Sequence, residues 1–424
     1  MLKQCIVILC ILICTGSIIS AQDTTYVKTL IDELSSETYF GRGYLKNGCN
    51  KAAEFLKKEM KNIGLQPYNN DYFQEFSFWV KTFPENITLS IDGQVFMYSY
   101  DYIINAESDN IHGTWPLIEI DSINLSDSMA FAALKSENFQ DKVVYIHDKY
   151  IGNNHLKSEI KEKIKHNHLN AKAYIYIKDH YTNWNVSTCQ KQPPVIQFTH
   201  TSFPDNPDSV SIHFNSKIRN VEVKNVIGYL PGNTENTFVL TAHYDHLGGI
   251  GDTIFFPGAN DNASGVAACL DIASYYTTHP HNFNLLIMLF AGEEAGLLGS
   301  MYAAANPVVP NEDIDFLINL DMVGTGEKGY TIVNAADTAY HEARELFDRI
   351  NKDNNYISDL AYRGIAANSD HYPFHAMGVK SVFIYARGGE SWYHHVKDTP
   401  ETVSLSGYTG LFNLLTKFME SYDR

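Results

Sequence analysis

After a short apolar leader, the chain begins with a helical pattern of hydrophobic positions. Between residues 24 and 66, apolar side chains recur three or four positions apart, and Gly64 follows the last of them. Residues 74–104 then change to alternating aromatic and β-branched positions, which are typical of strands. This part of the sequence therefore predicts helices followed by strands.

A different texture starts near residue 110. Two short apolar runs, Val143–Ile146 and Tyr174–Ile177, lie among polar segments that include the highly charged stretch 157–165. Pro, Asn and Asp, which favour turns, are frequent towards the end of this region. The pattern predicts a strand-rich inserted domain over residues 110–218.

From residue 219 onward, the order strand, loop, helix repeats. Four apolar runs stand out as strand candidates: Phe238–Ala242, Leu285–Phe290, Phe316–Leu320 and Val382–Tyr385. Continuous apolar runs of this length suit strands buried on both faces, as in a sheet sandwiched by helices. Residues 22–109 and 219–424 are therefore predicted to form one α/β domain.

The leader itself, residues 1–21, has the features of a cleavable signal peptide. Lys3 is followed by the apolar stretch 6–13, which is too short to span a membrane comfortably, and then by small residues. We therefore expect a secreted or periplasmic protein without a membrane span in the mature chain. Two alternatives stay open: an uncleaved anchor, and a lipid anchor at Cys14, although Ile13 before it is a poor match to that pattern.

Composition narrows the class of protein. The hydrophobic fraction of 44% is enough for a large core, and the net charge of -17 comes without the basic stripe that a nucleic-acid partner requires. Beyond the leader, the cysteines are Cys49, Cys189 and Cys269, whose wide spacing forms no metal-binding motif. One bridge between Cys49 and Cys189 stays open, and so does the oligomeric state.

Polar side chains follow each of the four apolar runs. These residues are His243 and Asp245 after the first run, Glu293 and Glu294 after the second, Asp321 at the third, and Tyr393, His394 and His395 after the fourth. In open α/β sheets, sites form at the carboxyl ends of strands, where these residues would gather. Imidazole and carboxylate groups without sulfur suit zinc, and they also accept manganese or cobalt.

Acidic residues at two places point to a more specific arrangement. Asp261 lies at a predicted helix start, where it is a suitable cap and where its two oxygens could bridge two cations. The adjacent pair Glu293 and Glu294 follows a buried strand, so both carboxylates would suffer desolvation and mutual repulsion. A metal removes that penalty for one glutamate and leaves the other as a general base.

Together these segments resemble the di-zinc aminopeptidase family that also contains glutamate carboxypeptidase, transferrin receptor and glutaminyl cyclase. The resemblance covers residues 24–105 and 219–424, and the region between them resembles a protease-associated domain. Its motifs occur in family order: His243-x-Asp245, Gly258-x-x-Asp261-Asn262-x-Ser264-Gly265, Glu293-Glu294-x-Gly296-Leu297-x-Gly299-Ser300, Asn319-Leu320-Asp321 and His394-x-x-x-Asp398-Thr399. The family implies a three-layer α/β fold, with a mixed, mostly parallel central sheet and helices on both faces, and an inserted β-rich domain.

The resemblance also implies two zinc ions that share one carboxylate. One ion would be bound by His243, Asp261 and Glu294. The second would be bound by Asp261, Asp321 and His394, so that Asp261 bridges the pair. The peptide bond after the bridging aspartate, to Asn262, is often cis in the family.

Further roles carry over from the family to matching positions. Asp245 would accept a hydrogen bond from the far nitrogen of His243 and fix its orientation. Glu293 would take a proton from the bridging water and pass it to the leaving amine. Tyr393 would help to polarise the scissile carbonyl, and Asp370 would line the pocket without an assigned role.

The expected function is that of a metal-dependent exopeptidase, an aminopeptidase acting on peptide substrates. A carboxypeptidase of the same family is the first alternative, and it needs a cation such as Arg363 or Arg387 for the substrate's terminal carboxylate. A glutaminyl cyclase-like enzyme and a non-catalytic, receptor-like binding protein are the others. The complete set of ligands and the intact Glu293-Glu294 motif favour a peptidase over both of these.

Overall fold

The computed structural model describes residues 24–68, 71–147, 154–179, 183–190, 192–389 and 392–422. The predicted signal peptide, with its alternatives, lies outside these residues. Within them, none of the helices is long and apolar enough to cross a membrane.

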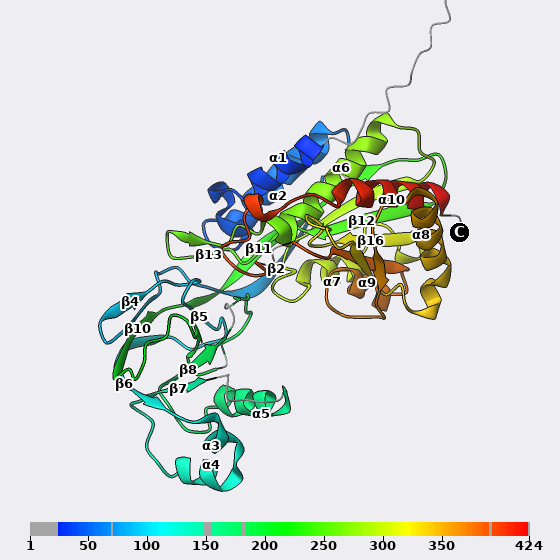
Figure 1. Ribbon diagram of the computed structural model, residues 1–424. Coiled ribbons are helices and arrows are strands. Elements are labelled where there is room, and N and C mark those ends of the chain that lie inside the picture. The colour runs from blue at the N-terminus through cyan, green and yellow to red at the C-terminus, as the bar shows by residue number, and fades with distance from the viewer. Residues whose placement is uncertain are drawn as a thin grey trace, which may run out of the picture.

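A central mixed sheet forms the larger part of the molecule (Figure 1). Its strand order is β1-β11-β15-β12-β16-β19-β17-β18, and β2 pairs with β11. The bounds are β1 Gln66–Pro67, β2 Phe73–Thr82, β11 Lys217–Leu230, β12 Thr237–His243, β15 Asn284–Phe290, β16 Phe316–Leu320, β17 Tyr330–Val333, β18 Leu360–Tyr362 and β19 Ser381–Ala386. The four strands predicted from apolar runs are β15, β12, β16 and β19, which lie next to one another in parallel at the centre.

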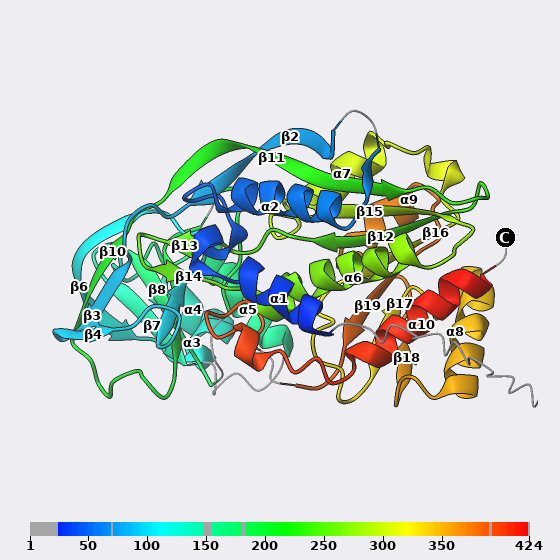
Figure 2. The same ribbon diagram turned by 90° about the horizontal axis from the view of Figure 1, so that it is seen from above.

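Helices cover both faces of this sheet, as the sequence predicts for strands that are apolar on both sides. On one face lie α1 Thr24–Leu34, α2 Gly48–Asn62, α6 Ser264–Thr278, α8 His341–Asn354 and α10 Tyr408–Ser421 (Figure 2). On the other face lie α7 Leu298–Ala305 and α9 His371–Ala376. Neighbouring residues of β12 point to opposite faces of the sheet. Leu240 belongs to the hydrophobic core under the first set of helices, and Val239 belongs to the core under α7 and α9.

Short helical turns connect these elements, namely η1 Glu37–Arg42, η3 Ala259–Ala263, η4 Asn311–Asp313, η5 Thr338–Tyr340 and η6 Pro400–Thr402. The helical region predicted over residues 24–66 thus contains α1, η1 and α2 with breaks between them. A small ribbon of β13 Gly249–Ile250 and β14 Ile254–Phe255 lies beside η1.

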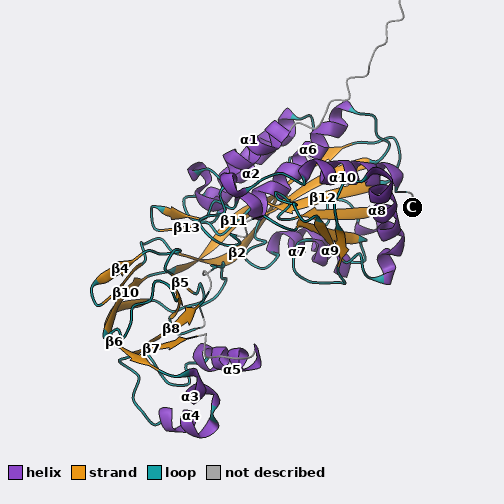
Figure 3. Cartoon of the chain, viewed as in Figure 1, coloured by secondary structure: helices purple, strands orange, loops and turns teal. Residues whose placement is uncertain are grey.

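A second sheet stands beside the first one (Figure 3). It contains β3 Thr88–Ile91, β4 Gln94–Phe96, β5 Tyr102–Ile104, β6 Ile111–Glu119, β7 Val143–His147, β8 Ala173–Lys178, β9 Val195–Thr199 and β10 Ser209–Phe214. The short helices α3 Ser122–Ser126 and α4 Ser128–Leu134 and the longer α5 Asn154–Lys165 accompany it. We call residues 88–214 the second-sheet domain.

The domain boundary predicted at residue 110 cuts through this second sheet. Strands β3, β4 and β5 precede residue 110, yet β3 pairs with β10 and β5 pairs with β9. The alternating pattern of residues 74–104 identified strands without revealing their partners, since pairing is a long-range property. The sheet pairing places the boundary between β2 and β3 instead.

The charged stretch 157–165 also proves to be more than polar surface. It forms most of α5, whose Ile160 and Ile164 lie four residues apart and are buried against Val144 and Tyr174. These two isoleucines are the apolar stripe of an otherwise charged helix, and they had no prediction attached to them.

Candidate metal centre

The ends of four neighbouring strands bring the predicted ligands together. His243 is the last residue of β12 and pairs with Phe290, the last residue of β15, so Glu293 and Glu294 follow on the adjacent connection. Asp321 comes directly after β16, on the other side of β12. His394 arrives from the connection that follows β19.

The ligand atoms form two groups that share Asp261. The Nε2 atom of His243 lies 3.3 Å from Oδ1 of Asp261 and 3.4 Å from Oδ1 of Asp321. The Nε2 atom of His394 lies 3.3 Å from Oδ2 of Asp261 and 3.1 Å from Oε2 of Glu294. The two oxygens of one carboxylate therefore face two different histidines.

These contacts differ from the grouping that the resemblance implied. His243 lies closer to Asp321 than to Glu294, although Glu294 is also within 4.8 Å of it, and His394 is in contact with Glu294. The physical reason is that β15 and β16 both flank β12, so strand order leaves both pairings open and only side-chain direction decides between them. Asp261 keeps its predicted place in both groups.

The centre is buried and rich in negative charge. His243, Asp261, Asp321 and His394 are 1%, 3%, 8% and 5% exposed, and Glu294 is similarly enclosed. Further buried carboxylates surround them, namely Asp245, Asp370 and Asp398, with Glu293 nearly buried. Buried carboxylates in such number require compensating positive charge, and the chemistry of the donor set fits divalent metal ions.

The pKa values of the adjacent residues Glu293 and Glu294 are shifted in opposite directions. Burial, the largest influence, raises the pKa of Glu293 well above its ordinary value, and the charges of Asp370 and Glu294 add to this. Burial also opposes ionisation of Glu294, but His394 and the hydrogen bond with His246 overcome it and lower its pKa to about 2. One carboxylate is thus permanently ionised, while its neighbour is able to hold a proton.

The loop before α6 is held in place by Asp398. Its carboxylate accepts hydrogen bonds from the backbone N–H groups of Asn260 at 2.9 Å and Asp261 at 3.0 Å. The peptide bond between Asp261 and Asn262 is cis, as the resemblance implied. Gly258 has a φ of 62°, and a Cβ there would lie 2.5 Å from the ring of His246. Only glycine fits this position.

The fully buried Arg42, which we did not predict, also holds this loop through hydrogen bonds to its backbone. The guanidinium of Arg42 donates to the carbonyl oxygens of Tyr244 at 2.7 Å, Leu34 at 2.8 Å, and Pro257 and Gly258 at 2.7 Å each. It therefore ties the end of α1 to the connections that carry His243 and Asp261. A lone arginine in a polar connection gives no sequence signal of such a role.

Asp245 occupies a different role from the predicted one. Its carboxylate lies 3.8 Å from Nδ1 of His243, whereas its backbone carbonyl lies within hydrogen-bonding distance at 3.1 Å. The carboxylate instead accepts the N–H of Glu293 at 3.1 Å and the hydroxyl of Tyr44 at 3.0 Å. The carbonyl orients His243, and the side chain positions Glu293.

Two more residues contact the predicted ligands. His246, fully buried, has its Nδ1 atom 2.8 Å from Oε1 of Glu294. Ser369 donates to Oδ2 of Asp321 at 2.8 Å and accepts from the amide of Asn319 at the same distance. The pair of histidines three residues apart at a strand end was a usable signal for His246. For Ser369, the only signal in the sequence was its position next to Asp370.

The aromatic residue next to His394 is half exposed. The ring of Tyr393 stacks on that of His394 with 3.7 Å between centroids, and 40% of the residue is accessible. Burial of its hydroxyl and the charges of Asp261 and Glu294 raise the pKa of Tyr393, so the hydroxyl remains a hydrogen-bond donor. His395 is engaged elsewhere, because its Nδ1 accepts the N–H of Lys397 at 3.1 Å.

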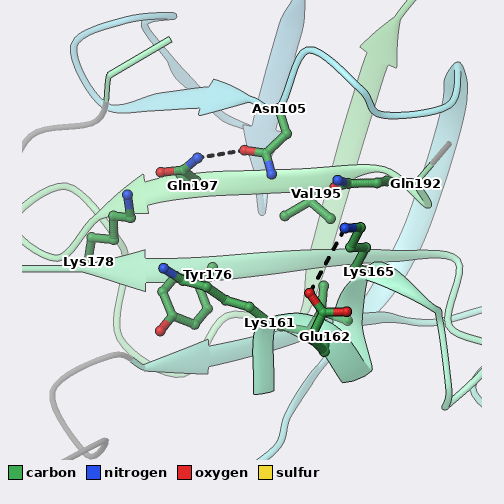
Figure 4. A pocket seen from close by; sticks show the side chains of 10 residues that line it. Asn105, Lys161, Glu162, Lys165, Tyr176, Lys178, Gln192, Val195 and Gln197 are labelled. Atoms are coloured by element: carbon green, nitrogen blue, oxygen red, sulfur yellow. Dashed lines mark hydrogen bonds and ion pairs between the residues drawn. The ribbon is translucent and has the colours of Figure 1, made fainter. Parts of the chain in front are cut away.

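A separate pocket lies in the second-sheet domain and contains none of these residues. It has a volume of about 250 Å³ and is lined by Lys161, Lys165, Lys178 and the amides of Asn105, Gln192 and Gln197, among others (Figure 4).

The sequence is similar to those of known peptidases. Residues 225–419 match the model of Peptidase family M28. Aminopeptidase YwaD of Bacillus subtilis is 32% identical over 198 residues, which are 43% of this chain and 40% of that protein. A probable leucine aminopeptidase of Arthroderma otae is 29% identical over 167 residues, covering 37% of this chain and 44% of that protein. The matches thus span less than half of the length of these curated relatives.

Solved structures extend the likeness of the fold to nearly the whole chain. BSAP, a zinc aminopeptidase from Bacillus subtilis, superposes with a TM-score of 0.66 at 22% identity and 94% coverage of both chains. An aminopeptidase from Aneurinibacillus gives 0.63 at 19% identity, covering 94% of this chain and 93% of that one. The mixed α/β fold predicted from the sequence is confirmed.

Proposed function

Residues 225–419 belong to peptidase family M28, and from that premise we propose that this protein is an aminopeptidase that removes N-terminal residues from peptides with two zinc ions. The two ions would be held by His243, Asp261 and Asp321 on one side, and by Asp261, Glu294 and His394 on the other. Under the same proposal, the second-sheet domain is the protease-associated-like module that the sequence resembles.

The observation that carries this proposal is the spacing of the ligand atoms about Asp261. Ligand atoms about 2.0–2.1 Å from a tetrahedral zinc ion lie about 3.3 Å from one another. The four distances that join the histidine nitrogens to the carboxylate oxygens of the two groups are 3.1–3.4 Å. The residues therefore fit two adjacent ions that share the carboxylate of Asp261.

The chemistry follows from the groups around these ligands. Two bound zinc ions would supply a nucleophile near neutral pH, by lowering the pKa of water from 15.7 to about 7, and polarise the scissile carbonyl. Glu293 lies beside the cluster, with Oε2 4.0 Å from Nε2 of His243. Its raised pKa suits it to accept the proton of the attacking water and to donate it to the departing amine. The hydroxyl of Tyr393 can donate to the carbonyl oxygen of the substrate.

Of the two arginines that a carboxypeptidase could use, Arg387 has surroundings that favour an aminopeptidase instead. Nη2 of Arg387 lies 2.6 Å from the carboxylate of Asp359 and also donates to that residue's carbonyl. Nη1 of Arg363 donates to the hydroxyl of Tyr385 at 3.3 Å. Arg387, which a carboxypeptidase could use to hold a terminal carboxylate, is therefore already neutralised by an acidic partner.

The test is hydrolysis of a panel of aminoacyl anilides by the zinc-loaded protein, with and without a chelator. Substrates with a free amine should be cleaved, chelation should stop turnover, and added zinc should restore it. The Glu293→Gln variant should bind both ions but lose at least 100-fold in kcat, because general acid–base catalysis contributes about 10²–10⁴-fold.

Glu342→Gln is the matched control, since Glu342 lies exposed on α8 and should leave turnover unchanged. Cleavage of N-blocked substrates from their carboxyl end would replace the proposal with a carboxypeptidase. Cyclisation of an N-terminal glutamine would replace it with a glutaminyl cyclase. Absence of bound zinc from the purified protein would overturn the metal centre itself.

A further inference from the structure

One segment of the second-sheet domain reaches across to the metal centre. The ring of Trp184 is 2% exposed and packs between Phe83 and Phe256, with centroid distances of 5.0 and 5.1 Å. Its indole Nε1 donates to the carbonyl of Ile104, in β5, at 3.2 Å. Trp184 is therefore fixed at the junction between the two sheets, and its main chain lies against the connection that carries His394.

The contact with His394 consists of three hydrogen bonds. The backbone N–H of Trp184 donates to the carbonyl of His394 at 3.1 Å. The Nδ1 atom of the His394 ring lies 2.7 Å from the carbonyl oxygen of Trp184 and 2.7 Å from Oδ1 of Asn185. Both the backbone and the ring of this histidine thus find partners in the segment 184–185.

These contacts determine which ring nitrogen carries the proton. A carbonyl oxygen can only accept, so Nδ1 of His394 must carry a hydrogen to bond with Trp184. Asn185 then presents its oxygen rather than its NH₂ group to the same hydrogen. Neutral His394 consequently has its lone pair on Nε2, the atom that faces Asp261 and Glu294.

His394 depends on this support more than the other ligands do. His243 is fixed at the end of a central strand, and Asp261 is held through its loop by Arg42 and Asp398. His394 lies outside the strands and has a φ of 56°, in the left-handed region that a non-glycine residue adopts only when its surroundings impose it.

We propose that Trp184 and Asn185 are positioning residues of the metal centre, so that the second-sheet domain completes the zinc site shared by Asp261, Glu294 and His394. The inference rests on the proposed function, because it concerns the ions proposed there. Oxygen acceptors on the far nitrogen of a ligating histidine fix its tautomer and orientation and raise its basicity.

The experiment measures zinc affinity rather than turnover. Metal-free full-length protein is titrated with zinc in competition with a chelator of known affinity, for wild type and for Asn185→Ala, Asn185→Asp and Asn183→Ala. In Asn185→Ala, one of the two ions should bind roughly tenfold more weakly, the lower end of the effect of removing an outer partner of a ligand. The other ion, at His243, should keep its affinity.

The remaining variants separate positioning from a general disturbance of the segment. Asn185→Asp retains an acceptor and should keep affinity at or above that of wild type. Asn183→Ala, two residues earlier in the same segment, should leave both ions unaffected. Asn185 is exposed, so none of these variants threatens the fold, and unchanged unfolding of the zinc-free proteins checks this.

The outcomes distinguish this inference from the function on which it rests. Two tightly bound ions in wild type with unchanged affinities in Asn185→Ala would overturn the positioning role alone. Equal weakening of both ions by Asn185→Ala and Asn183→Ala would also overturn it. Absence of zinc from the wild-type protein would overturn the proposed function and the positioning role together.

Discussion

Arg42 donates to five carbonyl oxygens, the four already described and that of Asp261 at 3.4 Å, which sets it apart from an ordinary buried ion pair. Desolvation in this site lowers the pKa of Arg42 to about 10, so the side chain remains charged at neutral pH. Its positive charge lies next to the loops that carry His243 and Asp261, close enough to interact electrostatically with Asp398 and Asp261. The same side chain therefore satisfies buried backbone oxygens and offsets part of the negative charge of the centre.

Replacing Arg42 should destabilise the whole protein. In Arg42→Met the four carbonyl groups that lie 2.7–2.8 Å from the guanidinium, and that of Asp261 at 3.4 Å, lose their donor, and each buried polar group left unpaired costs about 1–3 kcal/mol. We expect the free energy of unfolding to fall by about 3 kcal/mol or more in urea titrations. Arg344→Met is the control, because Arg344 forms an exposed ion pair at 3.9 Å with Asp348 and lies 4.7 Å from the ring centroid of Tyr362, and the loss of these two surface contacts should cost less than about 2 kcal/mol. Equal losses of unfolding free energy in the two variants would show that the buried hydrogen bonds of Arg42 contribute no more to stability than surface contacts do.

At this scale the sequence revealed the kinds of residue but not their contacts. The resemblance implied His243, Asp261, Glu294, Asp321 and His394 as ligands, in agreement with the imidazoles and carboxylates at strand ends and at one helix start. The contacts in the structure favour a different grouping of these ligands, which depends on side-chain directions. The supporting bonds from Arg42, Asn185 and the carbonyl of Asp245 join distant parts of the chain or involve the backbone, and neither leaves a local pattern.

Among the elements, strand β2 has a buried cation near its end. Lys81 is 3% exposed, donates to the carbonyl of Ser108, and lies near the rings of Phe83 and Phe214. Burial lowers the pKa of Lys81 to about 8, against an ordinary value of 10.5, although Asp109 acts in the opposite direction. Between these two pH values the unfolded chain binds the proton that the folded protein has lost.

This difference predicts how stability depends on pH. The free energy of unfolding should rise relative to that of Lys81→Met as the pH increases from about 8 to 10.5, since the cost of burying the charge disappears in this window. The comparison of the two unfolding curves cancels other groups that titrate there. Lys58→Met, at an exposed position of α2, should give a curve parallel to that of wild type. A parallel curve for Lys81→Met would contradict the prediction.

Elements were predictable from the sequence where one face or both faces are uniformly apolar. The run Phe238–Ala242 is buried at each residue, so its hydrophobic pattern alone indicates a central strand. Helix α5 escaped prediction because most of it is the highly charged stretch 157–165, in which only Ile160 and Ile164 are apolar. Strands β3 to β5 were recognised as strands, but the sheet they join depends on the distant strands β10 and β9, with which β3 and β5 pair.

For the whole molecule, the bound ions should act as part of the folded structure. The unfolded chain cannot hold the ligands in place, so under the proposed function zinc would bind the native state preferentially and stabilise it. At a free zinc concentration a thousandfold above the Kd, one site contributes about 4 kcal/mol. Thermal and urea unfolding should therefore shift to markedly lower values after chelation and recover with zinc.

A ligand variant provides the control for this shift. Asp321→Ala removes a proposed ligand of the site at His243 only, so chelation should then produce a smaller change than in wild type. Superimposable unfolding curves with and without chelator would show that the acidic cluster folds without ions, and would contradict the prediction.

The chain leaves the central sheet and returns to it at directly paired positions. Thr82, the last residue of β2, is opposite Lys217, the first residue of β11. The second-sheet domain therefore occupies the place of the turn in an antiparallel hairpin. Because the entropy of closing a loop grows only slowly with its length, the size of the module inserted there matters little to the closure of the hairpin. A module without the segment 184–185 would omit the acceptors of His394 and the ring that packs on Phe256, so exchange of the module would affect zinc retention and core packing together.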